Sequence, residues 1–397
     1  AGGVFTEDRI VERQVARLAE VQHMGHGHLA SDILNALTTT PGYMRIEELD
    51  TPVLTMDLDA LEENLDRYQA YYTAHGIGLR PHIKTHKTLA VAHMQIAKGA
   101  IGLTCQKIGE AEVMVHGGLN KDILIPFNII GKQKLDRLTA LARRTERLTV
   151  AADSAYTVNG LSESAAAEGV TIGVVVEVET TANRTGVTSP QEAVTLAQLI
   201  DDSPGLELRG IMGFPTPPKV RPLIQEILAL FDQHSLPHPI VSGGSTGFAL
   251  QAHEIPELTE YRIGEYPVGG YGHLLAGRHT VEQCALRVIA TVVSRPTDGR
   301  AVLDCGSKTM SASILQTDKG PSIGYIVEYP DAQFYSFSEE HGHVDISACA
   351  KKPVIGERVQ VLPVHPCPCV NEHEELVAVR KGRVEAVWPI YARGKIR

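Results

Sequence analysis

From about residue 58 onward, short apolar runs alternate with longer amphipathic segments. The runs hold about five to eight residues and are rich in β-branched side chains, which is typical of buried strands. Eight of them predict strands at 77–83, 101–105, 122–126, 147–151, 171–178, 207–213, 239–242 and 258–263. The segments between them predict helices, such as ALEENLDRYQAYYTAHG, which ends in a glycine suited to a helix C-cap.

Eight strands, each followed by a helix, are the element count of a (β/α)8 barrel, and the region has close to the ~250 residues usual for that fold. An open doubly wound sheet is the alternative. No G-x-G-x-x-G follows the first strand, which disfavours a dinucleotide-binding sheet. After about residue 280, strands alternate with turns, with a hairpin expected at Lys381-Gly382. The pattern therefore predicts a TIM-type (β/α)8 barrel followed by a mostly antiparallel β domain.

The predicted architecture divides the chain into three parts. Residues 1–45 form an N-terminal extension, 46–280 the barrel that holds the chemistry, and 281–397 the β domain. The extension contains IVERQVARLAEVQ, which has helical spacing, and HMGHGH. Three histidines could bind a metal, but a glycine-rich stretch near a terminus is more often a mobile segment. We expect the extension to be partly helical or mobile.

Composition narrows the class of protein. The 397 residues carry a net charge of −10, which disfavours nucleic acid as a partner. No apolar run reaches the roughly 18 residues of a membrane helix, and the start shows no signal-peptide pattern. Six scattered cysteines are too few for a disulfide scaffold. We expect a cytoplasmic enzyme that acts on a small molecule, with no nucleic-acid or membrane partner.

Polar residues and glycines gather where the predicted strands end. In (β/α)8 barrels these C-terminal strand ends surround the active site. The first strand runs into RPHIKTHK, residues 80–87, and the second ends at Gln106. The fifth leads to Arg184, the seventh ends in SGGST at 242–246, and the eighth is followed by Tyr266. The candidate site therefore lies at this mouth.

The glycine-rich turn VSGGSTG fits a phosphate-binding loop. Gly243 and Gly244 allow backbone N–H groups to approach an anion, and Ser245 and Thr246 add hydroxyl donors at a possible helix start. A tight turn without a ligand is the alternative. The place after the seventh strand, where barrel enzymes usually bind phosphate, favours the phosphate interpretation.

The predicted phosphate site suggests a chemical role for Lys84. A phosphate-bearing cofactor that needs a lysine at the barrel mouth suggests pyridoxal phosphate, held as a Schiff base. The neighbouring cations Lys87 and Arg80 would lower the pKa of the amine. A solvated basic loop, a phosphate or nucleic-acid patch, or a metal site remain alternatives for the motif on its own.

A second chemical motif lies in LPVHPCPCVNEHEE. His365 and Cys367 would point to one face of a strand, and imidazole with thiolate suits zinc. Two protein ligands would leave positions open for water or substrate. The prolines argue against regular strand geometry, so spacing alone leaves the site open. SEEHGHVD, with Glu339 to His343, is a second candidate cluster or a solvated loop.

Lys84, SGGSTG and His365-Pro366-Cys367 together resemble the D-threonine aldolase / D-serine dehydratase family of fold-type III, alanine-racemase-like pyridoxal-phosphate enzymes. The resemblance runs from DTPVLTMDLDALEENL to EAVWPIYARG, residues 50–394. RPHIKTHK is its most specific motif. Supporting motifs follow in the expected order: GAIGLTCQKIGEAEV, DILIPFNIIG, VEVETTANRTGV, VSGGSTG, VLDCGSKTMS and EEHGH.

The resemblance implies roles for individual residues. Lys84 would carry the cofactor and move the Cα proton, Arg184 would lie against the ring oxygen, and Gln106 would lie near the ring. His365 and Cys367 would bind a divalent metal, Zn²⁺ first and Mn²⁺ or Mg²⁺ as alternatives, that grips the substrate β-hydroxyl. The resemblance also implies a homodimer. The phosphate would be held by Gly243, Gly244, Ser245, Thr246 and Tyr266.

The choice of reaction rests on departures within the family. Its aldolases typically have His-x-Asp at the metal and its dehydratases His-x-Cys, and this chain has Cys367. Phe214 and PTPPKVR also lack the tyrosine and histidine that aldolases tend to carry, whereas Gln106 and WPIYARG are more aldolase-like. We expect D-serine dehydratase-like β-elimination of a D-β-hydroxy amino acid to a 2-oxo acid and ammonia. The alternative is D-threonine aldolase-type cleavage to glycine and an aldehyde. An amino-acid racemase or a non-catalytic cofactor-binding protein fits less well.

Overall fold

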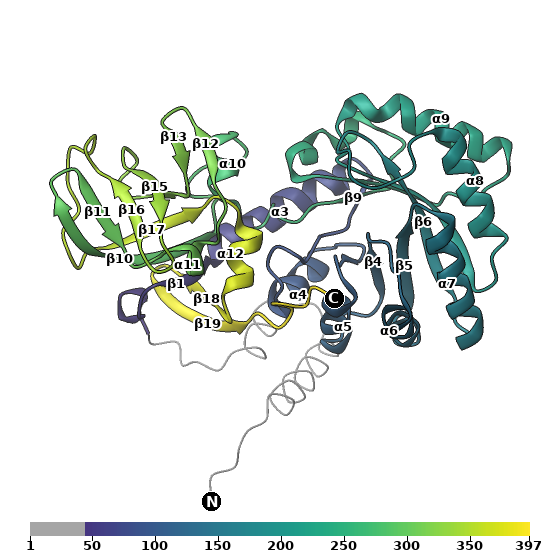
Figure 1. Cartoon of the computed structure of the whole chain (residues 1–397), viewed down its shortest axis with the longest axis horizontal. Helices are drawn as coiled ribbons and strands as arrows, with labels where there is room; N and C mark the ends of the chain where they lie inside the picture. Colours follow the sequence, from purple (N-terminus) through teal and green to yellow (C-terminus); the bar gives the residue numbers. More distant parts are fainter. Residues whose placement is uncertain (1–43) are drawn as a thin grey trace, which may run out of the picture.

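The computed structural model describes residues 44–397. Figure 1 shows two bodies, a parallel sheet with its helices and an antiparallel β body, with the long helix α3 (Leu58–Ala74) running between them. The helix expected at 10–22 and the HMGHGH stretch lie outside the described residues. Within residues 44–397, no helix combines the length and apolar character needed to cross a bilayer.

Eight parallel strands form the first body, and each overlaps one of the eight predicted runs. Their order is β2-β9-β8-β7-β6-β5-β4-β3. A bridge between His82 and Thr104 brings the ends of β2 and β3 together, so the strands surround a common axis. The predicted TIM-type barrel is confirmed. The strands are β2 (Gly78–Leu79), β3 (Leu103–Thr104), β4 (Asp122–Ile125), β5 (Arg147–Ala152), β6 (Ile172–Glu179), β7 (Leu206–Phe214), β8 (Ile240–Gly244) and β9 (Glu260–Arg262).

Helices cover the outside of the barrel, and their sequences explain where they begin and which face they bury. Ser154 and Ser189 cap α7 and α8 by accepting a backbone N–H at the third helical position. Helix α9 buries Ile224, Ile227 and Phe231, which share one face at helical spacing. The helices are α4 (Leu89–Ala97), α5 (Ile108–His116), α6 (Lys132–Ala142), α7 (Ala155–Glu168), α8 (Pro190–Asp201), α9 (Arg221–Gln233) and α10 (Tyr271–Leu275), with the 3₁₀ helices η1 (Ile46–Glu48), η2 (Pro218–Val220) and η3 (Thr246–Glu254).

The second body is a closed antiparallel barrel. Strand β10 (Leu286–Thr297) pairs with both β11 (Arg300–Leu303) and β17 (Arg358–Pro363), which closes a ring through β16 (Gly342–Asp345), β15 (Gln333–Phe337) and β14 (Gly324–Ile326). The predicted antiparallel β domain is confirmed. Outside the ring lie β12 (Leu315–Thr317), β13 (Gly320–Ser322), α11 (Ser307–Met310), α12 (Pro366–Glu372), β18 (Glu375–Arg380) and β19 (Arg383–Pro389).

The hairpin between β18 and β19 also matches the prediction. Lys381 and Gly382 both have positive φ, at 50° and 74°, as a two-residue type I′ turn requires. Glycine is suited to the second position because it adopts this conformation without steric cost.

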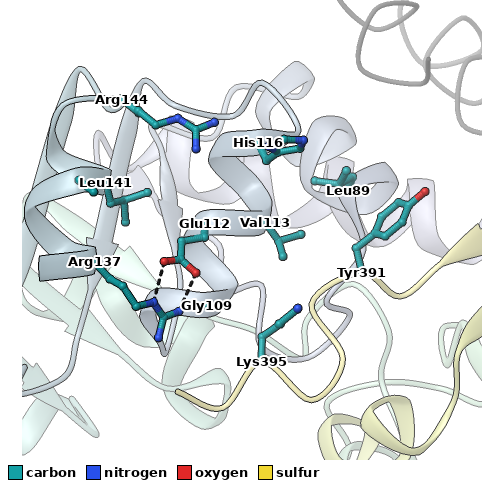
Figure 2. Close-up of a pocket in the computed structure, with 11 residues that line it drawn as sticks. Leu89, Gly109, Glu112, Val113, His116, Arg137, Leu141, Arg144, Tyr391 and Lys395 are labelled. Carbon is teal, nitrogen blue, oxygen red and sulfur yellow. Dashed lines mark hydrogen bonds and ion pairs between the residues drawn. The ribbon is translucent and has the colours of Figure 1, made fainter. Parts of the chain in front are cut away.

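The two bodies exchange segments at both ends. Strand β1 (Val53–Asp57) lies in the range expected for the (β/α)8 barrel, yet it pairs antiparallel with β10 and parallel with β18. The residues after β19 return to the parallel barrel, where Gly109 N–H donates to Arg397 O at 2.9 Å. Figure 2 shows Tyr391 and Lys395 of this segment beside α5, near the Arg137–Glu112 ion pair. Segments that are distant in sequence therefore fasten the β body to the barrel.

Candidate active site

A cavity of about 490 Å³ opens at the C-terminal ends of the parallel strands. Its walls come from the ends of β2, β3, β4, β6, β7 and β8, with the loops that follow them, and from the residues around and after the end of β9. It brings together five of the predicted site residues, at the place that the barrel rule predicts. They are Lys84, Gln106, Arg184, Ser245 and Thr246.

The loop after β2 presents Lys84 to this cavity. Within residues 81–90 every residue is buried except Lys84, which is half-buried. His82 supports the loop, because its Nε2 lies 3.0 Å from Gln106 Oε1 and its Nδ1 accepts from Lys84 N–H at 3.4 Å. Burial, reinforced by the charge of Lys84, lowers the pKa of His82 well below its ordinary value, so this imidazole is neutral. A primary amine is thus held beside a neutral ring.

The other cations of the basic motif are not free to act on that amine. Lys87 Nζ lies 2.8 Å from Glu110 Oε1, and both side chains are buried. Arg80 pairs with Asp122 at 2.7 Å and Glu260 at 2.8 Å inside the barrel. Adjacent carboxylates therefore offset the charges of Lys87 and Arg80. The motif combines one presented amine with structural ion pairs.

Three other arginines, Arg184, Arg262 and Arg278, line the cavity, and the first two have defined partners. Arg184 stacks on Phe214, with the guanidinium carbon 4.8 Å from the ring centre, and lies 3.4 Å from Glu177. Arg262 is buried and donates to the backbone oxygens of Ser242 and Gly213 at 2.9 Å each. Burial lowers the pKa of Arg262 to about 10, so it still carries its charge at neutral pH. Sequence analysis identified Arg184 and missed Arg262.

The glycine-rich turn places hydroxyls at the opposite wall. Ser245 adopts φ 140°, donates its N–H to Arg262 O at 3.2 Å and accepts Gly247 N–H on its Oγ at 3.1 Å. Helix η3 begins at the next residue, Thr246. Gly244 N–H donates to Thr216 Oγ1 at 3.0 Å. The turn has the composition of an anion site, and it brings Ser245 and Thr246, which carry hydroxyls, to the cavity wall.

Besides Gly244, two predicted phosphate residues do not line the cavity. Tyr266 is buried in the core against Tyr68, with ring centres 5.1 Å apart, and does not line the cavity. Gly243 also lies outside the lining. A Cβ on Gly243 would come within 2.6 Å of the Tyr261 ring, so the glycine is required by packing. The structure therefore gives neither residue a direct contact with the cavity.

Gly243→Ala should lower the free energy of unfolding by about 1–3 kcal/mol, because Tyr261 has no room to move in the core. Gly160→Ala is the matched control. Gly160 lies within α7, and a Cβ there would meet its nearest neighbour, Leu135, at 3.6 Å. That control should raise the free energy of unfolding by about 0.5–1 kcal/mol. Denaturant unfolding of both variants measures the difference, and equal stabilities would contradict the packing role.

These residues fit pyridoxal phosphate. The cofactor needs an amine for its aldehyde, an anion site for its phosphate and charged partners for its ring. Lys84, the Ser245–Gly247 turn and the two arginines supply these groups around one cavity. The volume is within the range of small-molecule sites.

A second group of residues adjoins the cavity. Ligand atoms of Glu265, His365 and Cys367 all lie within 4.8 Å of one another, and within residues 44–397 this is the one such group of three. The expected strand geometry is wrong, because His365 precedes α12 and Cys367 lies in its first turn. Cys367 Sγ also lies 3.2 Å from Thr85 Oγ1, next to Lys84. Nitrogen, sulfur and oxygen donors of this kind fit Zn²⁺.

Electrostatics in this group follow from burial and close contacts. Burial, with the Glu265 carboxylate beside it, raises the pKa of the Cys367 thiol to about 12. Burial alone would raise the pKa of Glu265, but hydrogen bonds from His273 and His365 outweigh it and hold this pKa well below its ordinary value. A bound cation would favour the thiolate by the same Coulombic rule.

The other candidate cluster is a surface ion-pair group. Glu339 and Glu340 each lie 2.9 Å from Lys308 Nζ, and all three side chains are exposed. Glu265 and His273 were not predicted from the sequence, although Glu265 lies in the loop after the eighth barrel strand. The strand-end rule that identified Gln106 would have identified Glu265 as well.

Comparisons with known proteins agree with this architecture. The alanine racemase N-terminal domain model matches residues 56–272, and the putative serine dehydratase domain model matches 285–379. A D-threonine aldolase from an Arthrobacter species is 32% identical over 365 residues, covering 88% of this chain and 94% of the relative. A 3-hydroxy-D-aspartate aldolase from Paracoccus denitrificans is 30% identical, covering 91% and 100%. A D-threo-3-hydroxyaspartate dehydratase from a Delftia species is 30% identical, covering 80% and 91%.

Solved structures give the same grouping. D-threonine aldolase from Filomicrobium marinum superposes with a TM-score of 0.80 at 30% identity, covering 90% of this chain and 100% of that one. The D-threo-3-hydroxyaspartate dehydratase structures include a histidine-to-alanine variant, with a TM-score of 0.80 at 26% identity, covering 87% and 96%. They also include a cysteine-to-alanine variant in the metal-free form. It superposes with a TM-score of 0.78 at 27% identity and covers 87% of this chain and 98% of that one. The chain therefore belongs to the D-threonine aldolase / D-serine dehydratase family of alanine-racemase-like pyridoxal-phosphate enzymes.

Proposed function

We propose that this enzyme uses pyridoxal phosphate and a divalent metal to eliminate water from D-3-hydroxy amino acids, giving a 2-oxo acid and ammonia. As a member of its family, it is a pyridoxal-phosphate lyase. One observation carries the proposal: Cys367, which adjoins His365 and Glu265, lies 3.2 Å from Thr85, the residue after Lys84. A presented amine and a metal-binding group are thus adjacent.

The metal pair supports elimination over carbon–carbon cleavage. The histidine and the cysteine replaced in the two dehydratase variants are two positions apart, and the cysteine variant is the metal-free form. His365 and Cys367 have the same spacing in this chain. The proposal therefore assigns them the metal, with Zn²⁺ as the expected ion because imidazole and thiolate suit it.

When bound, the cofactor supplies an electron sink for the bond broken at Cα, and the metal supplies a Lewis acid for the β-hydroxyl. Lys84 holds the cofactor through its amine and, once the amine is released, takes the Cα proton on Nζ. His82 and Gln106 fix the loop that positions this nitrogen. Arg262 and Arg184 would provide positive charge around the ring, and the Ser245–Gly247 turn, which lines the same cavity, would hold the phosphate.

The surrounding residues keep the cavity selective. Met212, Phe214 and Pro215 line one wall with apolar atoms. Burial keeps His82 neutral, so it does not compete with Lys84 for the role of a charged acid. His365 and Cys367 would hold the metal that supplies a Lewis acid for the hydroxyl on Cβ. The family resemblance also supports a homodimer, which sedimentation of the purified protein would test.

Product analysis on one pure substrate tests the reaction. Elimination from D-threonine should give 2-oxobutyrate and ammonia in equal amounts. Retro-aldol cleavage would give glycine and acetaldehyde instead. D-serine and 3-hydroxy-D-aspartate extend the assay to substrates without a methyl group and with a second carboxylate, and L-threonine is the stereochemical control. Absence of both product pairs with every D-substrate would refute the proposal.

D-threonine aldolase-type cleavage is the second candidate. It is favoured by the 32% identity to an Arthrobacter D-threonine aldolase over 94% of that relative. It needs the same amine and metal, but requires a base that removes the β-hydroxyl proton. The product assay separates the two reactions directly.

A further inference from the structure

We propose that Glu265 is a third protein ligand of the metal and that His273 is the positioning residue that holds it. This inference rests on the proposed function, because it concerns the metal assigned above to His365 and Cys367. It changes the character of that centre from a two-ligand to a three-ligand site. The geometry of the Glu265 carboxylate supports the assignment.

The two oxygens of Glu265 face in different directions. Oε1 lies 3.1 Å from His365 Nε2 and 3.3 Å from Cys367 Sγ. In a tetrahedral zinc site, bond lengths of about 2.0–2.3 Å place neighbouring ligand atoms roughly 3.3–3.6 Å apart. The two distances from Glu265 are thus already close to the edge lengths of a coordination tetrahedron, and all three donor atoms lie within 4.8 Å of one another.

The second oxygen is held by α10. Oε2 lies 2.5 Å from His273 Nε2, and the His273 side chain is 6% exposed. Cys367 is fixed in the same way, by a hydrogen bond between its Sγ and Thr85 Oγ1, which are 3.2 Å apart. Ligands that packing and a second shell of hydrogen bonds hold in place need little rearrangement to bind a metal. Glu265 therefore has the support that a metal ligand requires.

A third ligand has chemical consequences. Carboxylate and thiolate together offset both charges of a divalent cation, so the centre is neutral before the substrate arrives. One tetrahedral position remains open, which directs the β-hydroxyl to a single place. The extra bond also retains the ion through repeated turnover. A site with two ligands would instead carry a net positive charge and exchange its metal readily.

Metal binding to the cofactor-loaded enzyme tests the assignment. Zn²⁺ content and the Zn²⁺ dissociation constant are measured by chelator competition for the wild type and for Glu265→Gln, which keeps the shape of the side chain and removes its charge. Glu265→Gln should raise the dissociation constant by at least about 100-fold, and His273→Asn by about 10-fold. Glu282→Gln, at an exposed glutamate away from the cavity, is the matched control and should leave the constant unchanged.

A Co²⁺-substituted enzyme gives a second readout. The visible bands of Co²⁺ should lose intensity in Glu265→Gln as water replaces the carboxylate, whereas the sulfur-to-cobalt charge-transfer band should persist because Cys367 is intact. Cys367→Ala should lose that band. Unchanged Zn²⁺ affinity and Co²⁺ spectrum in a folded Glu265→Gln protein would overturn this inference and leave the proposed function standing. A wild-type enzyme that binds no metal would overturn both.

Discussion

Lys84→Ala should lower kcat/KM by at least about 10⁴-fold, because it removes both the amine that holds the cofactor and the base at Cα. The unfolding midpoint of the apoprotein should change little, since Lys84 is half-buried and its Nζ makes no hydrogen bond within residues 44–397. Steady-state kinetics and thermal unfolding of the cofactor-free proteins measure the two effects.

Spectroscopy supplies the control for Lys84. The visible absorption of the bound cofactor should vanish on borohydride reduction of the wild type and leave the cofactor covalently attached to a peptide containing Lys84. The variant should retain no covalently attached cofactor after the same treatment. Covalent attachment at another lysine, or activity within tenfold of the wild type, would contradict the assignment.

Lys87→Met should have the opposite profile. It removes the partner of Glu110, and a buried carboxylate left without its cation costs about 3–5 kcal/mol. The folded fraction should still bind the cofactor, because Lys87 does not line the cavity. Denaturant unfolding of the apoproteins measures the loss of stability.

Lys98→Met is the matched control for Lys87. Lys98 pairs with Asp66 at 2.6 Å, but the two side chains are 33% and 60% exposed. A surface pair of this kind contributes at most about 1 kcal/mol. Similar losses for Lys87→Met and Lys98→Met would refute the structural role of the buried pair. Lys84 and Lys87 of RPHIKTHK could then not be assigned one chemical and one structural role.

The position of the site followed from the sequence because parallel strands have a simple rule. Eight apolar runs marked eight strands, and the polar residues at their ends had to meet at one mouth. Lys84, Gln106, Arg184, Ser245 and Thr246 do line one cavity there. Local chemistry was enough, since each residue lies in the loop that follows its own strand.

Details that depend on partners from elsewhere in the chain were not predictable in this way. The neutralisation of Lys87 depends on Glu110, and its backbone also pairs with Ala392, which follows the last strand. Tyr266 follows a strand end as Glu265 does, but its ring packs into the core while Glu265 faces His365. Both residues lie in a turn, in which Val268 N–H and Gly269 N–H donate to Glu265 O, and the sequence pattern did not indicate which side chain faces the cavity.

The sequence by itself determined the barrel, the antiparallel β domain, the presented lysine and the glycine-rich turn, because hydrophobic periodicity and strand-end chemistry are local properties. Only the tertiary structure decided that β1 joins the second sheet and that the cations flanking Lys84 are neutralised. It also decided that Glu265 meets His365 and Cys367. These contacts join residues far apart in the chain, such as Thr85 and Cys367, which are 282 positions apart. Their free energy comes from packing two bodies together, which no local window of sequence contains.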